Sequence, residues 1–168
     1  MAATGVLDDL TDDDDDDATS TPFVIVATEA DSDPTEEESA PGEGVMQAGE
    51  SGTIDGVQVI YLSARRDDSG LVSPDDGNEY IILRFEIENT NSEEVVISTL
   101  LQFELRDREG GTFNIALFAD IEEGLDTELP ANEQIEGEVA FEIPEGGGPY
   151  VVAYDDFLSD AELRWQVN

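Results

Sequence analysis

Four aspartates and an asparagine crowd one polar stretch of the chain and form its best candidate for a chemical site. Asp67, Asp68, Asp75, Asp76 and Asn78 lie within twelve residues of one another. Hard oxygen ligands from one flexible loop suit Ca²⁺, although their spacing differs from that of an EF-hand. The pattern predicts a calcium loop. A solvated acidic loop without a metal is the alternative that stays open, and no other cofactor is expected.

Catalytic chemistry is not indicated by the composition. The 168 residues include no histidine or cysteine, and all six basic residues are arginines. Most nucleophile–base pairs and all zinc–thiolate sites are therefore impossible. Two carboxylates could serve a glycosidase, but among 43 acidic residues some pair always has suitable spacing. We therefore expect that the protein is not an enzyme.

The net charge of the chain limits which classes of partner it can bind. The formal net charge is −37, and residues 1–48 account for 15 acids and no base. Residues 49–168 hold the other 28 acids and all six arginines, a net charge of −22. Such a field repels nucleic acid and anionic lipid, so neither is expected as a partner. The composition predicts adaptation to concentrated salt, with a calcium-loaded acidic surface as the alternative.

Residues 1–48 are predicted to form a disordered acidic tail. Their low hydrophobicity and like charge, which includes six consecutive aspartates at 12–17, cannot offset the entropy of ordering. Phe23, Val24, Ile25 and Val26 interrupt this pattern with a short apolar run of strand propensity. The run is either an inert apolar island or a strand that pairs with a sheet edge, in its own domain or in a neighbouring molecule.

From Gly49 the sequence consists of short runs in which apolar and polar residues alternate, separated by turn residues. This pattern predicts one domain over residues 49–168. In residues 80–89, Ile81, Leu83, Phe85 and Ile87 point one way, whereas Tyr80, Ile82 and the charged residues point mostly to water. Further strands are predicted within 52–63, 95–97, 101–105, 112–118, 135–143, 150–154 and 163–167, with a loop over 119–132. The pattern favours a two-sheet antiparallel β-sandwich of immunoglobulin-like type.

Four aromatic residues are predicted to fill the core between the two sheets: Phe85, Phe103, Phe141 and Trp165. For Trp165, a platform for stacking carbohydrate is the alternative. No apolar run reaches 18 residues, so no membrane-spanning segment is expected. The first seven residues lack the basic region of a signal peptide, so either the protein is cytoplasmic or a leader has been removed from this sequence.

Two segments carry a resemblance to a known family. Tyr80–Thr90 reads as a strand that ends in an asparagine turn, and Leu129-Pro130 precedes a motif in which Gly137, Val139, Phe141 and Ile143 alternate before Pro144. Together they resemble the immunoglobulin-like DUF4352 family over nearly all of residues 49–168. Ala131 departs from the family, which usually has glycine after the proline, and the lipid-bearing cysteine of a leader is missing. The family has no established catalytic residues.

The resemblance implies a secreted or lipoprotein-like module, so an extracellular or cell-surface location is expected. The function expected is that of a non-catalytic binding or interaction module on an acidic spacer, with an unknown protein or another copy of itself as partner. The alternative is a structural subunit of an extracellular filament or virion. In that case, the strand at residues 22–27 would pair with a neighbouring subunit.

Overall fold

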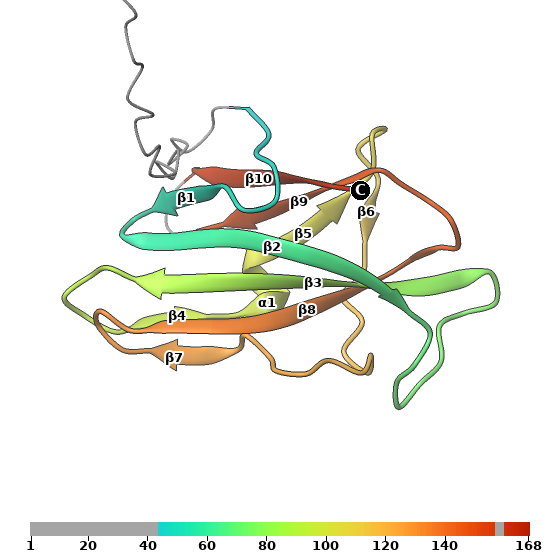
Figure 1. Cartoon of the computed structure of the whole chain (residues 1–168), viewed down its shortest axis with the longest axis horizontal. Coiled ribbons are helices and arrows are strands. Elements are labelled where there is room, and N and C mark those ends of the chain that lie inside the picture. Colours follow the sequence, from blue (N-terminus) through green and yellow to red (C-terminus); the bar gives the residue numbers. More distant parts are fainter. Residues whose placement is uncertain (1–43, 157–159) are drawn as a thin grey trace, which may run out of the picture. The chain divides into compact units, whose positions relative to one another are not determined.

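Two antiparallel four-stranded sheets pack face to face in this computed structural model, which describes residues 44–156 and 160–168 (Figure 1). The first sheet has the order β1 (Ser51–Ile54), β2 (Val57–Asp67), β3 (Asn78–Asn89), β8 (Gln134–Pro144). The second has the order β10 (Glu162–Val167), β9 (Tyr150–Asp155), β5 (Phe103–Arg106), β6 (Thr112–Phe113). A separate pair consists of β4 (Val95–Ile97) and β7 (Thr127–Leu129). The predicted β-sandwich is confirmed.

The core between the sheets contains the four predicted aromatic residues. Phe85, Phe141 and Trp165 are fully buried, and Phe103 is 5% exposed. The Phe85 ring lies 4.9 Å from the Phe103 ring and 5.9 Å from the Trp165 ring, between centroids. The Trp165 indole N–H donates to the Glu50 carbonyl at 2.8 Å. Trp165 is therefore a core residue, and the alternative of a carbohydrate platform is wrong.

The outer face of the first sheet is also covered, which corrects one expectation. Tyr80 and Ile82 were predicted to point mostly to water, yet they are only 3% and 1% exposed. The segment after β6 crosses this face and packs Ala116, Ala119 and Ile121 against Tyr80, Ile82 and Ala140. The strand predicted over 112–118 therefore ends at Phe113, because the chain leaves the second sheet to cover the first.

A buried carboxylate holds this crossing segment in place. Glu138 on β8 is 4% exposed, and its Oε2 accepts from the Glu122 N–H at 2.9 Å and from Arg65 Nη2 at 3.1 Å. Arg65 also donates to the Asp120 carbonyl at 2.8 Å. Burial raises the pKa of the Glu138 carboxyl, but Arg65 and the Glu122 N–H outweigh that effect, so the pKa lies below its ordinary value. Ionised Glu138 therefore fastens the segment to the sheet.

Removing this charge is expected to loosen the covering segment. Glu138→Gln should lower the free energy of unfolding by about 1–3 kcal/mol, because buried charge-assisted hydrogen bonds are lost. Amide exchange at residues 120–123 should accelerate. The contribution of Glu138 is present above its ordinary pKa and is lost as pH falls through the lowered folded-state value. Glu136→Gln on the same strand is the control, because its side chain is 44% exposed and should contribute at most about 1 kcal/mol. Equal losses in the two variants would contradict this role.

Candidate functional site

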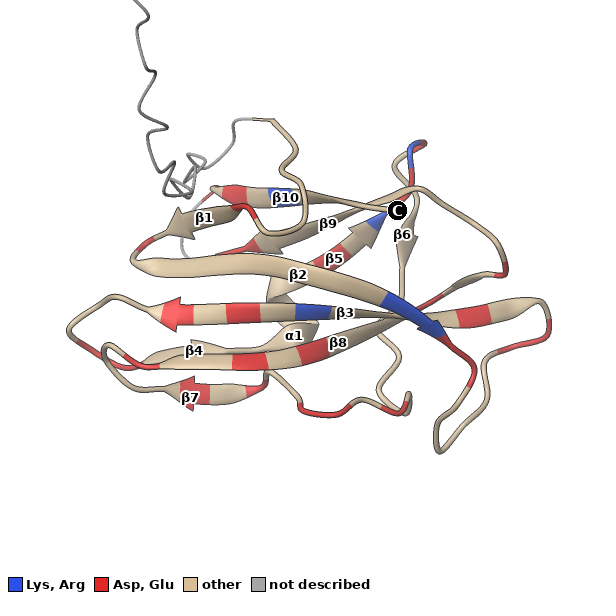
Figure 2. Ribbon diagram, viewed as in Figure 1, with Lys and Arg blue, Asp and Glu red and all other residues tan. Residues whose placement is uncertain are grey.

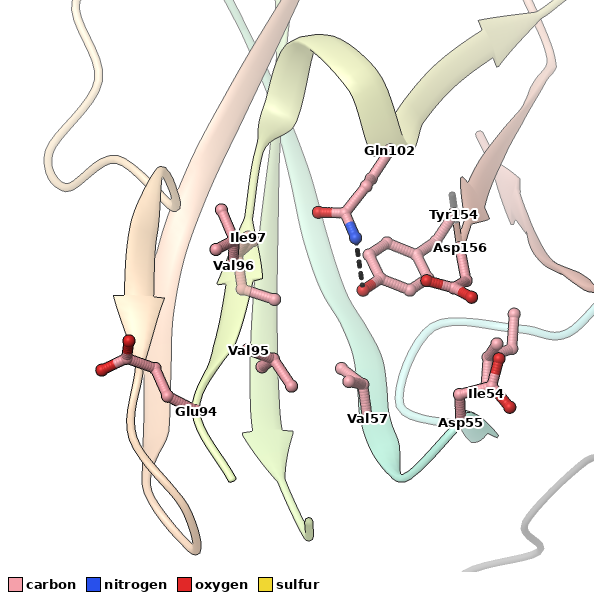
Figure 3. A pocket seen from close by; sticks show the side chains of 10 residues that line it. All are labelled: Ile54, Asp55, Val57, Glu94, Val95, Val96, Ile97, Gln102, Tyr154 and Asp156. Atoms are coloured by element: carbon pink, nitrogen blue, oxygen red, sulfur yellow. Dashed lines mark hydrogen bonds between the residues drawn. The ribbon is translucent and has the colours of Figure 1, made fainter. Parts of the chain in front are cut away.

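An apolar pocket of about 400 Å³ opens at one end of the sandwich (Figure 3). Ten residues line it: Ile54, Asp55, Val57, Glu94, Val95, Val96, Ile97, Gln102, Tyr154 and Asp156. Four of them, Ile54, Val57, Ile97 and Tyr154, also belong to the buried core. The pocket therefore lies against one end of the apolar core between the sheets.

One wall of the pocket is a tight hairpin turn between β1 and β2. The sequence predicted a single strand through this region, and that prediction is wrong. Asp55 and Gly56 both have positive φ, 46° and 76°, as a two-residue type I′ turn requires. A Cβ at Gly56 would lie 2.2 Å from Asn91 Oδ1, so glycine is needed on two grounds. The turn fixes Asp55 at the rim.

The opposite wall is β4, and Asn89 holds it in place. The Asn89 side chain, fully buried at the end of β3, donates to the Glu93 carbonyl at 2.8 Å and to the Leu129 carbonyl at 2.9 Å. These two carbonyls lie just before β4 and at the end of β7. The asparagine turn therefore ties the β4–β7 pair to the end of the sandwich, which gives that sequence motif a physical role.

The floor of the pocket carries a buried polar pair. Gln102 lies at the end of the four-residue helix α1 (Thr99–Gln102) and donates from Nε2 to the Tyr154 hydroxyl at 3.2 Å. Its Oε1 accepts from the Ser98 N–H at 2.7 Å. Burial raises the pKa of the Tyr154 hydroxyl, and the nearby Asp156 charge adds to this effect. The hydroxyl is therefore neutral at ordinary pH and serves as a hydrogen-bonding group.

The rim of the pocket is acidic. Asp55, Glu94 and Asp156 are the charged residues among the ten that line it, and none of the ten is an arginine. Figure 2 shows the arginines at other places, on β2, β3, β5 and β10 and in the turn between β5 and β6. A ligand that suits both floor and rim would combine an apolar group with a positive charge.

The sequence analysis did not single out this pocket. Its residues come from four separate stretches of the chain, which only the folded topology brings together. Val96, Leu100 and Leu101 are apolar but 60%, 58% and 68% exposed, which is a property of the fold that the sequence pattern does not show. Leu101 was predicted on a strand over 101–105, but it lies in α1 and β5 begins at Phe103.

Two of the five side chains of the predicted calcium loop, those of Asp67 and Asn78, are engaged in other contacts. Asp67 pairs with Arg65 at 2.7 Å and accepts from the Ser69 N–H at 2.8 Å. Asn78 donates from Nδ2 to Glu142 at 2.9 Å, and its N–H donates to the Asp75 carbonyl at 2.9 Å. Within residues 44–156 and 160–168, no three acidic side chains are grouped so that they could hold a metal ion. Asp67, Asp68, Asp75 and Asp76 are thus not gathered into one site, and calcium binding stays a prediction.

Calcium binding can be measured directly. If the loop binds calcium, about 1 mM Ca²⁺ in a background of concentrated KCl should raise the melting temperature, since extracellular sites bind in this range. Asp75→Asn with Asp76→Asn should abolish the rise. The same double substitution at Glu109 and Glu145, as Gln, is the control for lost charge. No heat of binding by calorimetry would leave the solvated loop as the correct interpretation.

The four residues of the predicted donor strand, Phe23, Val24, Ile25 and Val26, lie outside the described residues, as does nearly all of the predicted tail. The described part of the chain begins at Gly44, and Met46 is already a core residue at 4% exposure. Among the residues described, no helix has the length and apolar composition that a membrane crossing requires.

Solved structures share this fold. A candidate lipoprotein of Bacillus subtilis, ycdA, superposes with a TM-score of 0.60 at 14% identity over 70% of this chain, which spans 38% of the ycdA chain. The yjhA protein of the same species gives 0.60 at 16% identity, with 74% of this chain and all of that one covered. A conserved hypothetical protein of Bacillus anthracis gives 0.56 at 15% identity, with 73% and 95% covered. At such identities the likeness shows the fold.

The family of the chain is identified by its sequence. A comparison with curated proteins finds no match. The sequence model of the family described as "Domain of unknown function (DUF4352)" matches residues 46–163. That range begins at the buried Met46 and includes the pocket, the asparagine turn and nearly all of both sheets. The chain therefore belongs to the DUF4352 family.

Proposed function

We propose that this chain is a non-catalytic binding module of the cell surface or extracellular space, adapted to high salt, and that the end pocket is its ligand site. The pocket carries the proposal. It combines an apolar interior, a buried hydrogen-bonded pair at Gln102 and Tyr154, and an acidic rim, within a frame fixed by the Asp55-Gly56 turn and by Asn89. Such a cavity suits a small apolar group with a positive charge.

The chemistry of the pocket supports binding without turnover. Its polar groups are three carboxylates, one amide and one phenol. The raised pKa of Tyr154 keeps the phenol protonated, so it is a poor general base. The Gln102 amide is held by two hydrogen bonds and has no nucleophilic character. These groups can orient a ligand but offer no activated nucleophile.

The surface location rests on two further observations. The fold matches that of ycdA, which is described as a candidate lipoprotein. The first 48 residues carry 15 acids and no base, and like charges extend a chain. A module at the end of such a spacer would be held away from an anionic cell surface.

Two small probes of opposite charge test the ligand site. Benzylamine and benzoate share a ring, but only benzylamine complements the acidic rim. Benzylamine at millimolar concentration should shift the amide resonances of Val95, Gln102 and Tyr154, whereas benzoate should not, and the benzylamine should be recovered unchanged. Val95→Trp should fill the pocket and abolish the shifts. Leu71→Trp, at a site that is 91% exposed and lines another surface, should leave them intact. Equal binding of the two probes, or none, would overturn the proposal.

The alternative function, a filament or virion subunit, depends on residues 22–27 and stays a prediction. We expect the tail to act as a spacer alone, because 15 like charges oppose docking on an acidic domain. Ile25→Asp should then leave the melting temperature and the oligomeric state unchanged, and Val24 and Val26 should exchange their amide protons freely in about 2 M salt. Concentration-dependent oligomers that dissolve on Ile25→Asp would instead favour the subunit.

A further inference from the structure

The pocket runs along the edge of β4. It touches four consecutive residues, Glu94 to Ile97, whereas side chains on one face of a strand alternate. A cavity in contact with every residue in turn must therefore lie beside the backbone. β7 pairs with the opposite edge, in the register Val95 with Leu129 and Ile97 with Thr127. Figure 3 shows the pocket on the side of β4 that faces Val57 and Tyr154.

This edge of β4 keeps its capacity for backbone hydrogen bonds. In an antiparallel pair, alternate residues direct their N–H and C=O groups away from the partner strand. Within the described residues, no strand pairs with β4 on the pocket side. The edges of two longer strands, β10 and β8, are instead covered by other backbone segments. Met46 covers β10 through two backbone bonds of 2.8 Å with Arg164 and Gln166, and Ala116 donates to Ala140 on β8 at 2.8 Å.

Apolar surface continues from the pocket along the same edge. Val95, Val96 and Ile97 line the pocket, and the side chains of Val96, Leu100 and Leu101 are largely exposed. An extended segment laid along β4 could place one side chain in the pocket, on the face of Val95 and Ile97, and the next side chain on the opposite face, over Val96. Strand addition of this kind gains affinity from the backbone and specificity from pockets that take alternate side chains.

The charge of the rim selects the occupant. Asp55, Glu94 and Asp156 border the pocket, so a segment with lysine or arginine beside its apolar residues is favoured. A second copy of this chain would bring further acids, since the chain has 43 acidic and six basic residues. The chain's own apolar run at residues 23–26 is likewise bordered by acids. The complement is a basic segment of another protein.

We propose that β4 accepts an added strand from a partner protein. The partner supplies an extended segment with apolar residues at alternate positions and lysine or arginine at its flanks, and one apolar side chain enters the pocket above Gln102 and Tyr154. This inference rests on the proposed ligand site and names the class of its ligand. The added strand continues the β4–β7 pair into a three-stranded sheet.

Peptides of matched composition test the proposal on the full chain. The probe is the capped heptapeptide KVTVTVK, and one control is EVTVTVE. Two further controls are N-methylated forms of the probe: one carries methyl groups on its odd-numbered backbone amides, the other on its even-numbered ones. The probe should bind one to one and shift the Val95, Val96 and Ile97 amides. EVTVTVE and one methylated form should bind at least about tenfold more weakly. Val95→Trp, or Glu94→Gln if that variant misfolds, should weaken binding of the probe, whereas Glu109→Gln should not.

Each outcome separates this inference from the proposed function. Benzylamine binding without peptide binding would overturn strand addition and leave the ligand site standing. Failure of both probes would overturn both proposals. Equal affinity of the two methylated peptides and the parent would show recognition by side chains alone, which overturns strand addition. If Ile25→Asp shifts the β4 amides of the free chain, the chain's own tail occupies the edge, and the proposed partner is wrong.

Discussion

Replacing Phe85 with alanine is expected to lower the free energy of unfolding by about 3–5 kcal/mol. The ring is fully buried and packs against the rings of Tyr61, Phe103 and Trp165. Its neighbour across the sheet is Gly137, which has no side chain that could relax into the space left behind. The cavity should therefore persist, and cavities that cannot collapse are the costly ones. Denaturant unfolding in concentrated salt measures the loss.

The same substitution at an exposed phenylalanine provides the control. Phe118 lies on the segment that covers the first sheet, but its own side chain is 55% exposed. Phe118→Ala should change the free energy of unfolding by no more than about 0.5 kcal/mol. A loss below about 1 kcal/mol for Phe85→Ala, or similar losses at the two sites, would contradict the packing described for the core.

The strands that could be predicted were those with one buried face. From Leu83 to Glu88 of β3, apolar residues alternate with charged ones, and this period of two fixes which face lies inside. Tyr80 and Ile82 were assigned to water because the same rule was applied to the start of β3. The unbroken apolar run from Tyr80 to Leu83 was the contrary signal, since continuous runs are typical of strands that are covered on both faces.

The pocket could not be predicted in the same way. Asp55, Glu94 and Tyr154 are separated by dozens of residues in the sequence and meet only because the β1–β2 turn, β4 and β9 converge at one end of the sandwich. One part was readable locally: Asp-Gly between apolar runs is a strong signal for a two-residue hairpin. The contact of Asn89 with Leu129, which ties β7 to the end of β3, depends on tertiary structure that the local sequence pattern does not encode.

The melting temperature is expected to rise steeply between about 0.1 and 2 M monovalent salt, over which the screening length falls from about 10 Å to less than 3 Å. Residues 49–168 carry 28 acids and six arginines. Even if every arginine held two carboxylates, more than half of those acids would lack a cation. At an average spacing of roughly 15 Å, neighbouring charges repel by about 0.3 kcal/mol unscreened. Summed over the domain, about 5 kcal/mol of repulsion remains near 0.1 M salt, which is comparable to a domain's whole stability.

A variant with fewer charges distinguishes this repulsion from a general effect of salt on folding. Salt also weakens attractive pairs such as Arg65 with Glu138, so the predicted rise requires that repulsion dominates. Glu86, Glu128 and Glu133 lie at or near the surface of the folded domain. Replacing all three with glutamine should raise the melting temperature in about 0.1 M KCl and change it little in about 2 M KCl. An equal shift at both concentrations, or a flat melting temperature of the parent chain, would refute adaptation to salt as the reason for the acidic surface.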